Sequence, residues 1–177
     1  YDAMTLLPLG ADTDLAKETR SSEAGKEVRR QFGIAEEAFV IFTGGKLGPA
    51  KRTHLLLAAV LQSDNPNVHL LIVGDVGDAQ AEYKRQLIAS AEGSERVHFV
   101  GWVDGPDVYR FMDACDIAVF PASQSALWQQ ALSMGLPLVV GHVGVADPSY
   151  LNLYGNLIVL DEANITVCGI GERIQEL

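Results

Sequence analysis

The fold of this chain is decided by residues 38–57, which read AFVIFTGGKLGPAKRTHLLL. An unbroken apolar run of strand length, Ala38 to Phe42, leads into Thr43-Gly44-Gly45. Two lysines, Lys46 and Lys51, then flank a Gly-Pro turn, and an apolar helical segment follows. The stretch therefore predicts a strand, a glycine turn, a basic pair and a helix.

This arrangement is typical of an anion site. In a parallel sheet, backbone N–H groups at the start of the helix face outward and can hold an anion. Lys46 and Lys51 add two point charges, which suit a phosphate better than a neutral ligand. The stretch matches neither G-x-G-x-x-G nor G-x-x-x-x-G-K-[ST], so a dinucleotide-binding or Walker-type site is not expected. Taken alone, the glycines also fit a plain tight turn and the lysines a solvated loop.

Composition and charge narrow the class of protein. The chain has 177 residues, 48% hydrophobic and 20% charged, which is typical of one globular domain. Its formal net charge of -10 argues against nonspecific binding to nucleic acid or to an anionic membrane, but it allows one anionic ligand in a locally basic pocket. Two cysteines make neither a disulfide framework nor a zinc signature, so we expect a reducing, cytoplasmic setting. Since the chain begins at Tyr1 without Met, we expect a piece of a longer protein.

Apolar runs of strand length alternate with amphipathic segments along the chain. The expected strands are residues 38–42, 68–73, 97–100, 117–120, 138–140 and 157–160. The expected helices cover residues 23–32, 55–60, 78–92, 105–115 and 125–134, with a last one near the C-terminus. Residues 11–22 are polar and predict a surface loop or a loose helix. Strands that are apolar throughout indicate a parallel sheet covered on both faces. We therefore expect an α/β, Rossmann-like, doubly wound sheet of about six strands.

Ligands in such sheets bind outside the carboxyl ends of the strands. The segments at that edge are 44–51, 74–75, 101–104, 121–125 and 141–147. His142 lies there and is a candidate ligand or general base, whereas His69 and His98 lie inside strands and are expected to be packed or hydrogen-bonded. Trp102 is also at this edge, while Trp128 has helical spacing with Leu132 and is expected in the core. No two histidines have the spacing of metal ligands.

Several of these motifs together resemble a known family. They are GGKLGPAK (44–51), IVGD (72–75), VHFVGWV (97–103) and ALSMGLPLVV (131–140). They resemble the C-terminal, nucleotide-sugar-binding domain of group 1 glycosyl transferases, which are retaining enzymes with the two-Rossmann-domain GT-B architecture. LPLGADTD (7–14) is similar to that family's interdomain linker. The resemblance implies a linker over residues 1–22, a donor-binding domain over residues 23–177, and an N-terminal acceptor domain outside this chain.

The resemblance also implies roles for individual residues. Lys46 and Lys51 would bind the donor diphosphate, with Lys46 standing where the family has an Arg and lacking its bidentate fork. The other candidates are Gly45, Ser125, Ala126 and Leu127 for the diphosphate, Trp102 and Val103 for the base, Gln130 for the ribose, and Ser123 and Gln124 for the sugar side. The family's E-x7-E pair is changed, because Gln130 replaces its second Glu and Ala122 its first. No catalytic residue is assigned.

The hypothesis is the donor-binding half of a retaining glycosyltransferase that uses a UDP-, GDP- or ADP-sugar. Stabilising the departing nucleoside diphosphate would ease cleavage of the glycosidic bond. We expect no cofactor and no metal, because two lysines can supply that charge. An acceptor sugar or lipid, and any peripheral membrane association, would come through the missing domain, so the fragment alone should bind without turnover. The alternatives are a catalytically silent nucleotide-sugar-binding or regulatory domain, and a flavodoxin-like interaction or signalling domain.

Overall fold

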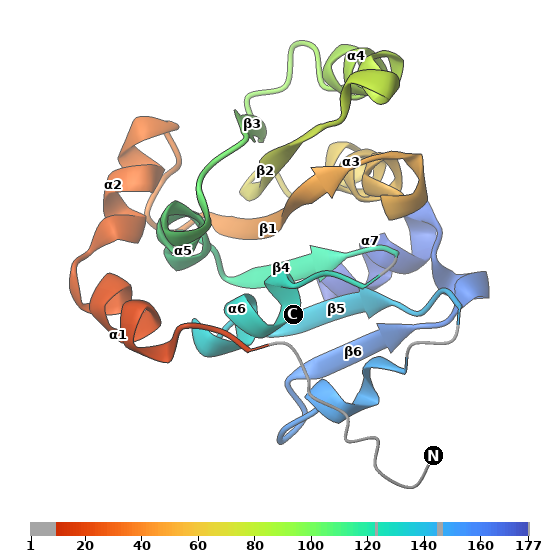
Figure 1. Ribbon diagram of the computed structural model, residues 1–177. Helices are drawn as coiled ribbons and strands as arrows, with labels where there is room; N and C mark the ends of the chain where they lie inside the picture. Colours follow the sequence, from red (N-terminus) through yellow and green to blue (C-terminus); the bar gives the residue numbers. More distant parts are fainter. Residues whose placement is uncertain (1–9, 123, 145–146, 177) are drawn as a thin grey trace, which may run out of the picture.

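The chain folds around a six-stranded sheet in which every strand is parallel to its neighbours (Figure 1). The computed structural model describes residues 10–122, 124–144 and 147–176. The strands are β1 (Phe39–Leu47), β2 (Val68–Val76), β3 (Val97–Gly101), β4 (Ile117–Phe120), β5 (Leu138–Gly141) and β6 (Leu157–Leu160). Their order in the sheet is β3-β2-β1-β4-β5-β6. This is the Rossmann order and differs from the flavodoxin-like order 2-1-3-4-5, so the flavodoxin-like alternative is wrong.

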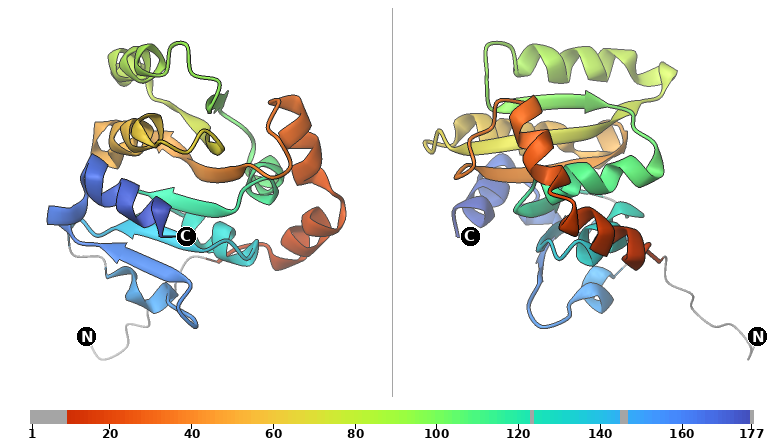
Figure 2. Two further views of the ribbon diagram at one scale, coloured as in Figure 1. Left: turned by 180° about the vertical axis from the view of Figure 1, so that it is seen from behind. Right: turned by 90° about the vertical axis from the view of Figure 1, so that its left-hand side faces the viewer.

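Helices cover both faces of the sheet, as predicted (Figures 1 and 2). The α-helices are α1 (Thr13–Ser21), α2 (Ala24–Gln31), α3 (Thr53–Gln62), α4 (Ala81–Ser90), α5 (Val108–Asp113), α6 (Leu127–Ser133) and α7 (Val167–Gln175). One buried cluster joins α1, α2, α5 and α6 to one face, and a second joins α3, α4 and α7 to the other. No helix in the described part of the chain is long and apolar enough to cross a membrane.

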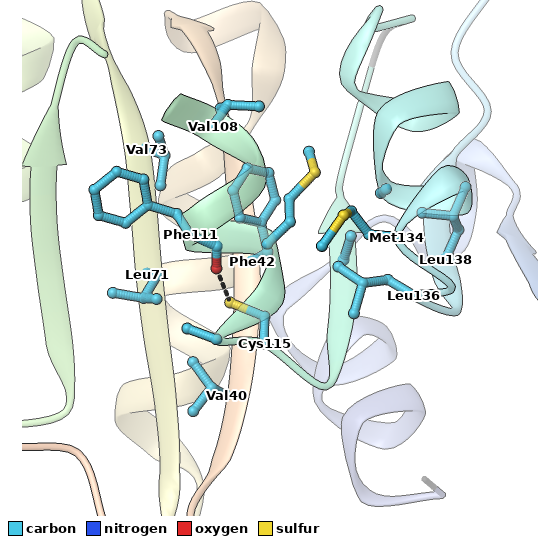
Figure 3. Close-up of a cluster of buried hydrophobic side chains, with 14 of the residues drawn as sticks. Val40, Phe42, Leu71, Val73, Val108, Phe111, Cys115, Met134, Leu136 and Leu138 are labelled. Carbon is cyan, nitrogen blue, oxygen red and sulfur yellow. Dashed lines mark hydrogen bonds between the residues drawn. The ribbon is translucent and has the colours of Figure 1, made fainter. Parts of the chain in front are cut away.

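The strands supply both clusters by alternation. In β1, Val40 and Phe42 point into the first cluster, while Ile41 points into the second. This is why the strands are continuous apolar runs. Figure 3 shows part of the first cluster, in which the buried Cys115 donates its Sγ–H to the Phe111 carbonyl at 3.1 Å. Burial raises the pKa of the Cys115 thiol well above its ordinary value, so Cys115 acts as a small core residue.

The predicted glycine turn after β1 is wrong, because β1 and β2 both continue through their glycines. The register pairs Gly44 with Val73, Gly45 with Gly74 and Lys46 with Asp75. A Cβ on Gly44 would lie 2.2 Å from the Val73 carbonyl oxygen, and one on Gly74 would lie 2.0 Å from the Gly45 oxygen. These glycines therefore allow two backbones to approach closely instead of reversing the chain. The turn comes later, at Gly48 and a 3-10 helix over Pro49–Lys51.

The polar segment before residue 23 is more ordered than a surface loop. Asp12 caps α1, since its Oδ1 accepts from the N–H groups of Asp14 at 3.1 Å and Leu15 at 2.9 Å. The Asp12 N–H donates to the Tyr109 hydroxyl at 3.0 Å, which ties α1 to α5. The part of the predicted linker that is described thus forms a docked helix. Residues 1–9, which include most of the linker-like LPLG, lie outside the described residues, and the linker assignment stays a prediction.

The amino ends of β1 and β4 are held by a partly buried arginine, Arg29. The Arg29 guanidinium donates to Asp116 Oδ2 at 3.0 Å, and the same oxygen accepts from the Val40 N–H at 2.7 Å. Arg29 also donates to the backbone carbonyls of Ala35, Glu36, Ala38 and Ala114. Because all three guanidinium nitrogens donate to groups near the two strand starts, the network fixes where the two central strands begin.

His69 and His98 meet near the amino ends of β2 and β3. Their nearest nitrogens, Nδ1 of His69 and Nε2 of His98, are 3.1 Å apart, the ring centroids 5.4 Å apart and the ring planes 3° apart. The distance between the ring centroids equals the N···N distance plus about one radius of each ring, so the two nitrogens lie on the line that joins the centroids. The rings are therefore nearly coplanar and meet edge to edge through one hydrogen bond. Burial and the neighbouring His69 lower the pKa of His98 to about 4. Both rings are partly buried and hydrogen-bonded, as expected from their place in strands.

Candidate functional site

The strand order reverses between β1 and β4, which makes the carboxyl ends of these two strands the switch point of the sheet. In open parallel sheets a crevice forms at this place because the connections leave in opposite directions. Two segments border it: residues 48–52 between β1 and α3, and residues 121–126 between β4 and α6. The predicted site residues Lys51, Gln124, Ser125 and Ala126 belong to these two segments, and Gly45 and Lys46 lie in β1 just before the first of them. The fold therefore brings them together.

A cavity of about 180 Å³ opens beside the switch point. Its lining consists of Gly45, Val73, Gly74, Trp102, Val103, Gly105, Val108, Ala126, Leu127 and Gln130. Residues predicted for the diphosphate, the base and the ribose thus share one cavity. The sequence reading missed Val73, Gly74, Gly105 and Val108 as lining residues. Val73 and Gly74 lie within β2, while Gly105 and Val108 begin a 3-10 helix and α5, and only the packing of α5 and α6 on the sheet shows that they reach the cavity.

The two tryptophans lie in opposite environments. Trp102 is 66% exposed at the cavity, directly after β3, where its ring is free to stack on a planar ligand. Trp128 is 2% exposed and packs edge-on against Phe120. The prediction that Trp128 belongs to the core is confirmed.

Gln130 presents an amide to the cavity from α6. Its Oε1 is buried and has no hydrogen-bond partner among the described residues. A buried acceptor without a partner costs about 1–3 kcal/mol. A hydroxyl group in the cavity would remove that cost, and the amide can both accept from and donate to a diol.

Lys51 spans the switch point. Its Nζ donates to the Gln124 carbonyl oxygen at 2.8 Å, which links the segment after β1 to the segment after β4. Lys51 is partly buried, and this burial lowers the pKa of its amine. Among the described residues it makes no ion pair. A partly desolvated cation with a single neutral acceptor is a place where an anion is favoured.

Lys46 is also without an ion pair to any described residue, but it points elsewhere. Its side chain lies along Gly77, where an added Cβ would be 3.5 Å from Lys46 Cε and 3.9 Å from Nζ. The neighbouring carboxylate, Asp75, is held by Lys84 at 2.7 Å. Lys46 does not line the cavity. Its share in a phosphate site with Lys51 stays a prediction.

The absence of partners distinguishes these lysines from most cations of the protein. Carboxylates pair with Lys17, Lys26, Arg29, Arg30, Arg52, Lys84, Arg85, Arg110 and Arg173. Arg20 and Arg96 have no carboxylate partner in the described part of the chain either. However, Arg96 donates to three backbone carbonyls and Arg20 is exposed on α1. The two unpaired lysines of an acidic protein therefore both lie at the carboxyl end of β1.

The segment between β4 and α6 is partly different from the prediction. Ala122, where the family has its first Glu, is 1% exposed and presents no polar group. Ser123 lies outside the described residues, and Gln124 is exposed. The helix begins at Leu127 and not at Ser125, because Ser125 Oγ accepts from the Leu127 N–H at 3.3 Å. The N–H group of Leu127, one of the residues predicted to bind the diphosphate, is therefore already satisfied.

His142 is not part of this cavity. It is partly buried after β5 and lines a separate hollow of about 340 Å³ with Asp161, Asn164 and Glu172. A hollow of about 170 Å³ also lies between α3 and α7, so cavity volume alone does not select a site. No group of three or more His, Cys, Asp or Glu residues in the described ranges is placed to hold a metal ion.

The family model described as Glycosyl transferases group 1 matches residues 38–167. This chain belongs to that family. The match runs from the residue before β1 to the first residue of α7, so it includes every predicted site residue. The predicted family and the Rossmann-like fold are both confirmed.

Curated relatives are similar in sequence to part of this group 1 chain. The lipopolysaccharide 1,2-N-acetylglucosaminetransferase of Salmonella typhimurium is 27% identical over 127 residues, which are 68% of this chain and 32% of the relative. The D-rhamnosyltransferase WbpZ of Pseudomonas aeruginosa is 34% identical over 113 residues, which are 59% of this chain and 27% of the relative. The chain thus spans about a third of the length of the curated relatives it matches.

A solved structure gives the same fold. HepE of Anabaena, described in complex with UDP and glucose, superposes with a TM-score of 0.78 at 24% identity. The superposition covers 94% of this chain and 45% of HepE. At this level of identity the likeness establishes the fold of this group 1 chain.

Proposed function

We propose that this chain is the donor-binding domain of a glycosyltransferase that moves a sugar from a nucleoside diphosphate sugar to an acceptor with retention. The observation that carries the proposal is Lys51, a partly buried, unpaired cation that spans the switch point beside the cavity. The family match supports the reaction class. HepE, which has the same fold, is described with UDP and glucose, and this supports a nucleoside diphosphate as ligand.

The size of the cavity suggests which part of a nucleoside diphosphate would lie inside it. Pockets for drug-sized ligands have volumes of about 300–1,000 Å³. The 180 Å³ cavity is smaller, so it would hold the nucleoside and leave the diphosphate outside, at the end of β1. The base would lie against Trp102 and Val103, and the ribose hydroxyls would satisfy Gln130 Oε1.

The lysines would then contribute to bond cleavage. When the bond between the anomeric carbon and the β-phosphate oxygen breaks, negative charge develops on that oxygen. Cations already placed there stabilise the charge without reorganising, and this is commonly a large term in catalysis. Lys51 and Lys46 would supply it, so no metal or cofactor is part of the proposal. The acceptor, a sugar or a lipid, and any peripheral membrane contact would belong to the rest of a longer cytoplasmic protein, and this chain alone would bind without turnover.

Calorimetric titration of this chain with UDP, GDP and ADP tests the proposal. At least one is expected to bind with a Kd below about 1 mM, that is, better than about -4 kcal/mol. If none of the three binds at millimolar concentration, the proposal is wrong. Trp102→Phe provides a check on the base site. Ligand should protect the exposed Trp102 from iodide quenching in the wild type, whereas the buried Trp128 that remains in the variant should show no ligand-dependent change.

A catalytically silent binding domain is the second candidate, and Ala122 favours it. This residue is buried and leaves no carboxylate where the resemblance places the family's first Glu. A longer protein that carries this domain separates the two candidates when it is given a donor and a panel of acceptors. Transfer with retained anomeric configuration supports the enzyme. Donor binding without transfer or hydrolysis supports the silent domain.

A further inference from the structure

Lys46 has an oppositely charged neighbour, Asp75, with which it forms no ion pair in the described part of the chain. In the register between β1 and β2, Lys46 stands directly beside Asp75. Opposite charges at neighbouring positions of adjacent strands attract each other and commonly pair. Here, within the described ranges, no ion pair joins them.

Asp75 is held by two other donors. Its Oδ2 accepts from Lys84 Nζ of α4 at 2.7 Å, and its Oδ1 accepts from the Val76 N–H at 2.7 Å. The hydrogen bond from Lys84 is the main reason why the pKa of the Asp75 carboxyl is below its ordinary value, and the Val76 N–H adds to it. Both carboxylate oxygens are thus occupied, and the carboxylate remains charged.

The Lys46 side chain packs along the loop after β2. The Lys46 side chain lies along Gly77, and a Cβ at Gly48 would be 2.6 Å from Gln80 Oε1. The segment 77–80 therefore packs directly on the end of β1. Lys46 is exposed beside it. Its ammonium group stays unneutralised at the edge where the sheet binds ligands.

We infer that Lys84 is a positioning residue that holds Asp75 away from Lys46 and so keeps Lys46 available to a phosphate group. The identity of that phosphate, the donor diphosphate, rests on the proposed function. Without Lys84, Lys46 is the cation that the strand register places beside the Asp75 carboxylate. A diphosphate would then meet a neutralised lysine and a carboxylate next to it, and like charges disfavour binding.

A double-mutant cycle with UDP tests this inference. Lys84→Ala is expected to weaken UDP binding about fivefold to tenfold and to leave uridine binding unchanged, because uridine has no phosphate. In the Asp75→Asn background the same Lys84→Ala change is expected to have no effect, since no carboxylate remains to capture Lys46. Arg85→Ala is the matched control, as Arg85 lies next to Lys84 on α4 and pairs with the exposed Glu82. If Lys84→Ala weakens UDP equally in both backgrounds, or in neither, the inference is wrong.

A second measurement needs no nucleotide. Crystal structures of Lys84→Ala, and of Lys84→Ala combined with Asp75→Asn, show where the Lys46 side chain lies. In Lys84→Ala the Lys46 ammonium should pair with the Asp75 carboxylate, and in the double variant it should stay beside Gly77. A Lys46 side chain that stays beside Gly77 in Lys84→Ala overturns the inference even if UDP binds. A wild type that binds no nucleoside diphosphate, together with the new ion pair in Lys84→Ala, overturns the proposed function and supports the role of Lys84.

Discussion

The cations at the two edges of the sheet differ in how many hydrogen-bond and ion-pair partners they have. At the amino edge, Arg29 is partly buried, and its guanidinium donates to one carboxylate and four backbone carbonyls. At the carboxyl edge, Lys51 is partly buried and has one neutral acceptor, and Lys46 has no carboxylate partner among the described residues. Each edge places cations beside the central strands.

The difference separates stability from binding. A satisfied buried charge contributes to the folded state mainly because its removal leaves partners without donors. An unsatisfied charge contributes little to stability, or opposes it, and its cost is recovered when a ligand arrives. We therefore expect substitutions at the amino edge to change stability and substitutions at the carboxyl edge to change ligand binding.

The largest effect is expected from Arg29→Ala. It removes the guanidinium donor from four backbone carbonyls and from Asp116, which then keeps only the Val40 N–H, so the free energy of unfolding should fall by about 3 kcal/mol. Urea unfolding followed by circular dichroism measures it, with an unchanged m-value. Arg30→Ala is the control, because Arg30 forms only an exposed pair with Glu27 and should change stability by less than about 0.5 kcal/mol. If both variants change the free energy of unfolding equally, the Arg29 network is no more important for stability than the exposed pair of Arg30 and Glu27.

The next effect concerns the close approach of β1 and β2. Gly74→Ala puts a Cβ about 2 Å from the Gly45 oxygen at a φ of 137°, so stability should fall by about 2 kcal/mol and the cavity beside Gly45 should change shape. Gly93→Ala is the matched control, since Gly93 also has a positive φ of 80° but open space around it. It should cost about 1 kcal/mol, and a loss as large as that of Gly74→Ala would mean that backbone strain alone explains both.

A smaller effect is expected at the histidine pair of the amino edge. The folded pKa of His98, about 4, is below the ordinary value of about 6.5, so the unfolded chain binds more protons between these values. Stability should therefore fall as pH decreases from about 6.5 towards 4. Because the pair is only partly buried, we expect about 1 kcal/mol or less between pH 7 and 5.5. Urea unfolding at several pH values should show a weaker dependence in His98→Gln. An unchanged slope in that variant would assign the dependence to other groups.

The smallest stability effect is expected from Lys51→Ala. Burial lowers the pKa of the Lys51 amine and no carboxylate of the described residues compensates it, so stability should stay the same or rise within about 0.5 kcal/mol. The measurement is the same urea unfolding used for Arg29→Ala. A loss comparable to that of Arg29→Ala would mean that Lys51 is a structural residue like its counterpart at the other edge.

Much of the fold is predictable from local pattern. The bounds of β4 and β6 follow directly from apolar runs, Ile117–Phe120 and Leu157–Leu160, that end at Pro121 and Asp161. The end of β1 was mispredicted because a glycine pair fits both a turn and a close strand approach, and the partner strand decides between them. Helix α1 was uncertain because it contains few apolar residues, although Asp12 is a suitable cap.

The site was predictable only in part. The strand-end rule placed Lys51 and Trp102 at one edge, and the family resemblance added Gln130, which lines the same cavity as Trp102. It did not predict that Lys84 reaches Asp75, because this contact depends on how α4 packs beside β2. Nor did it predict the burial of Ala122, which follows from the position of the segment after β4. Side chains that act through another element are thus the part that needs the tertiary structure.

The most direct test of the contrast between the edges compares UDP with uridine in the wild type and in the double variant Lys46→Ala, Lys51→Ala. Calorimetric titration gives the two affinities, and urea unfolding gives the stability of both proteins. In the double variant we expect UDP affinity to fall at least tenfold, or about 1.4 kcal/mol. Uridine affinity and the free energy of unfolding should stay nearly the same as in the wild type. If UDP binds the variant as well as the wild type, or if UDP and uridine lose affinity equally, the carboxyl edge does not hold a diphosphate through these lysines.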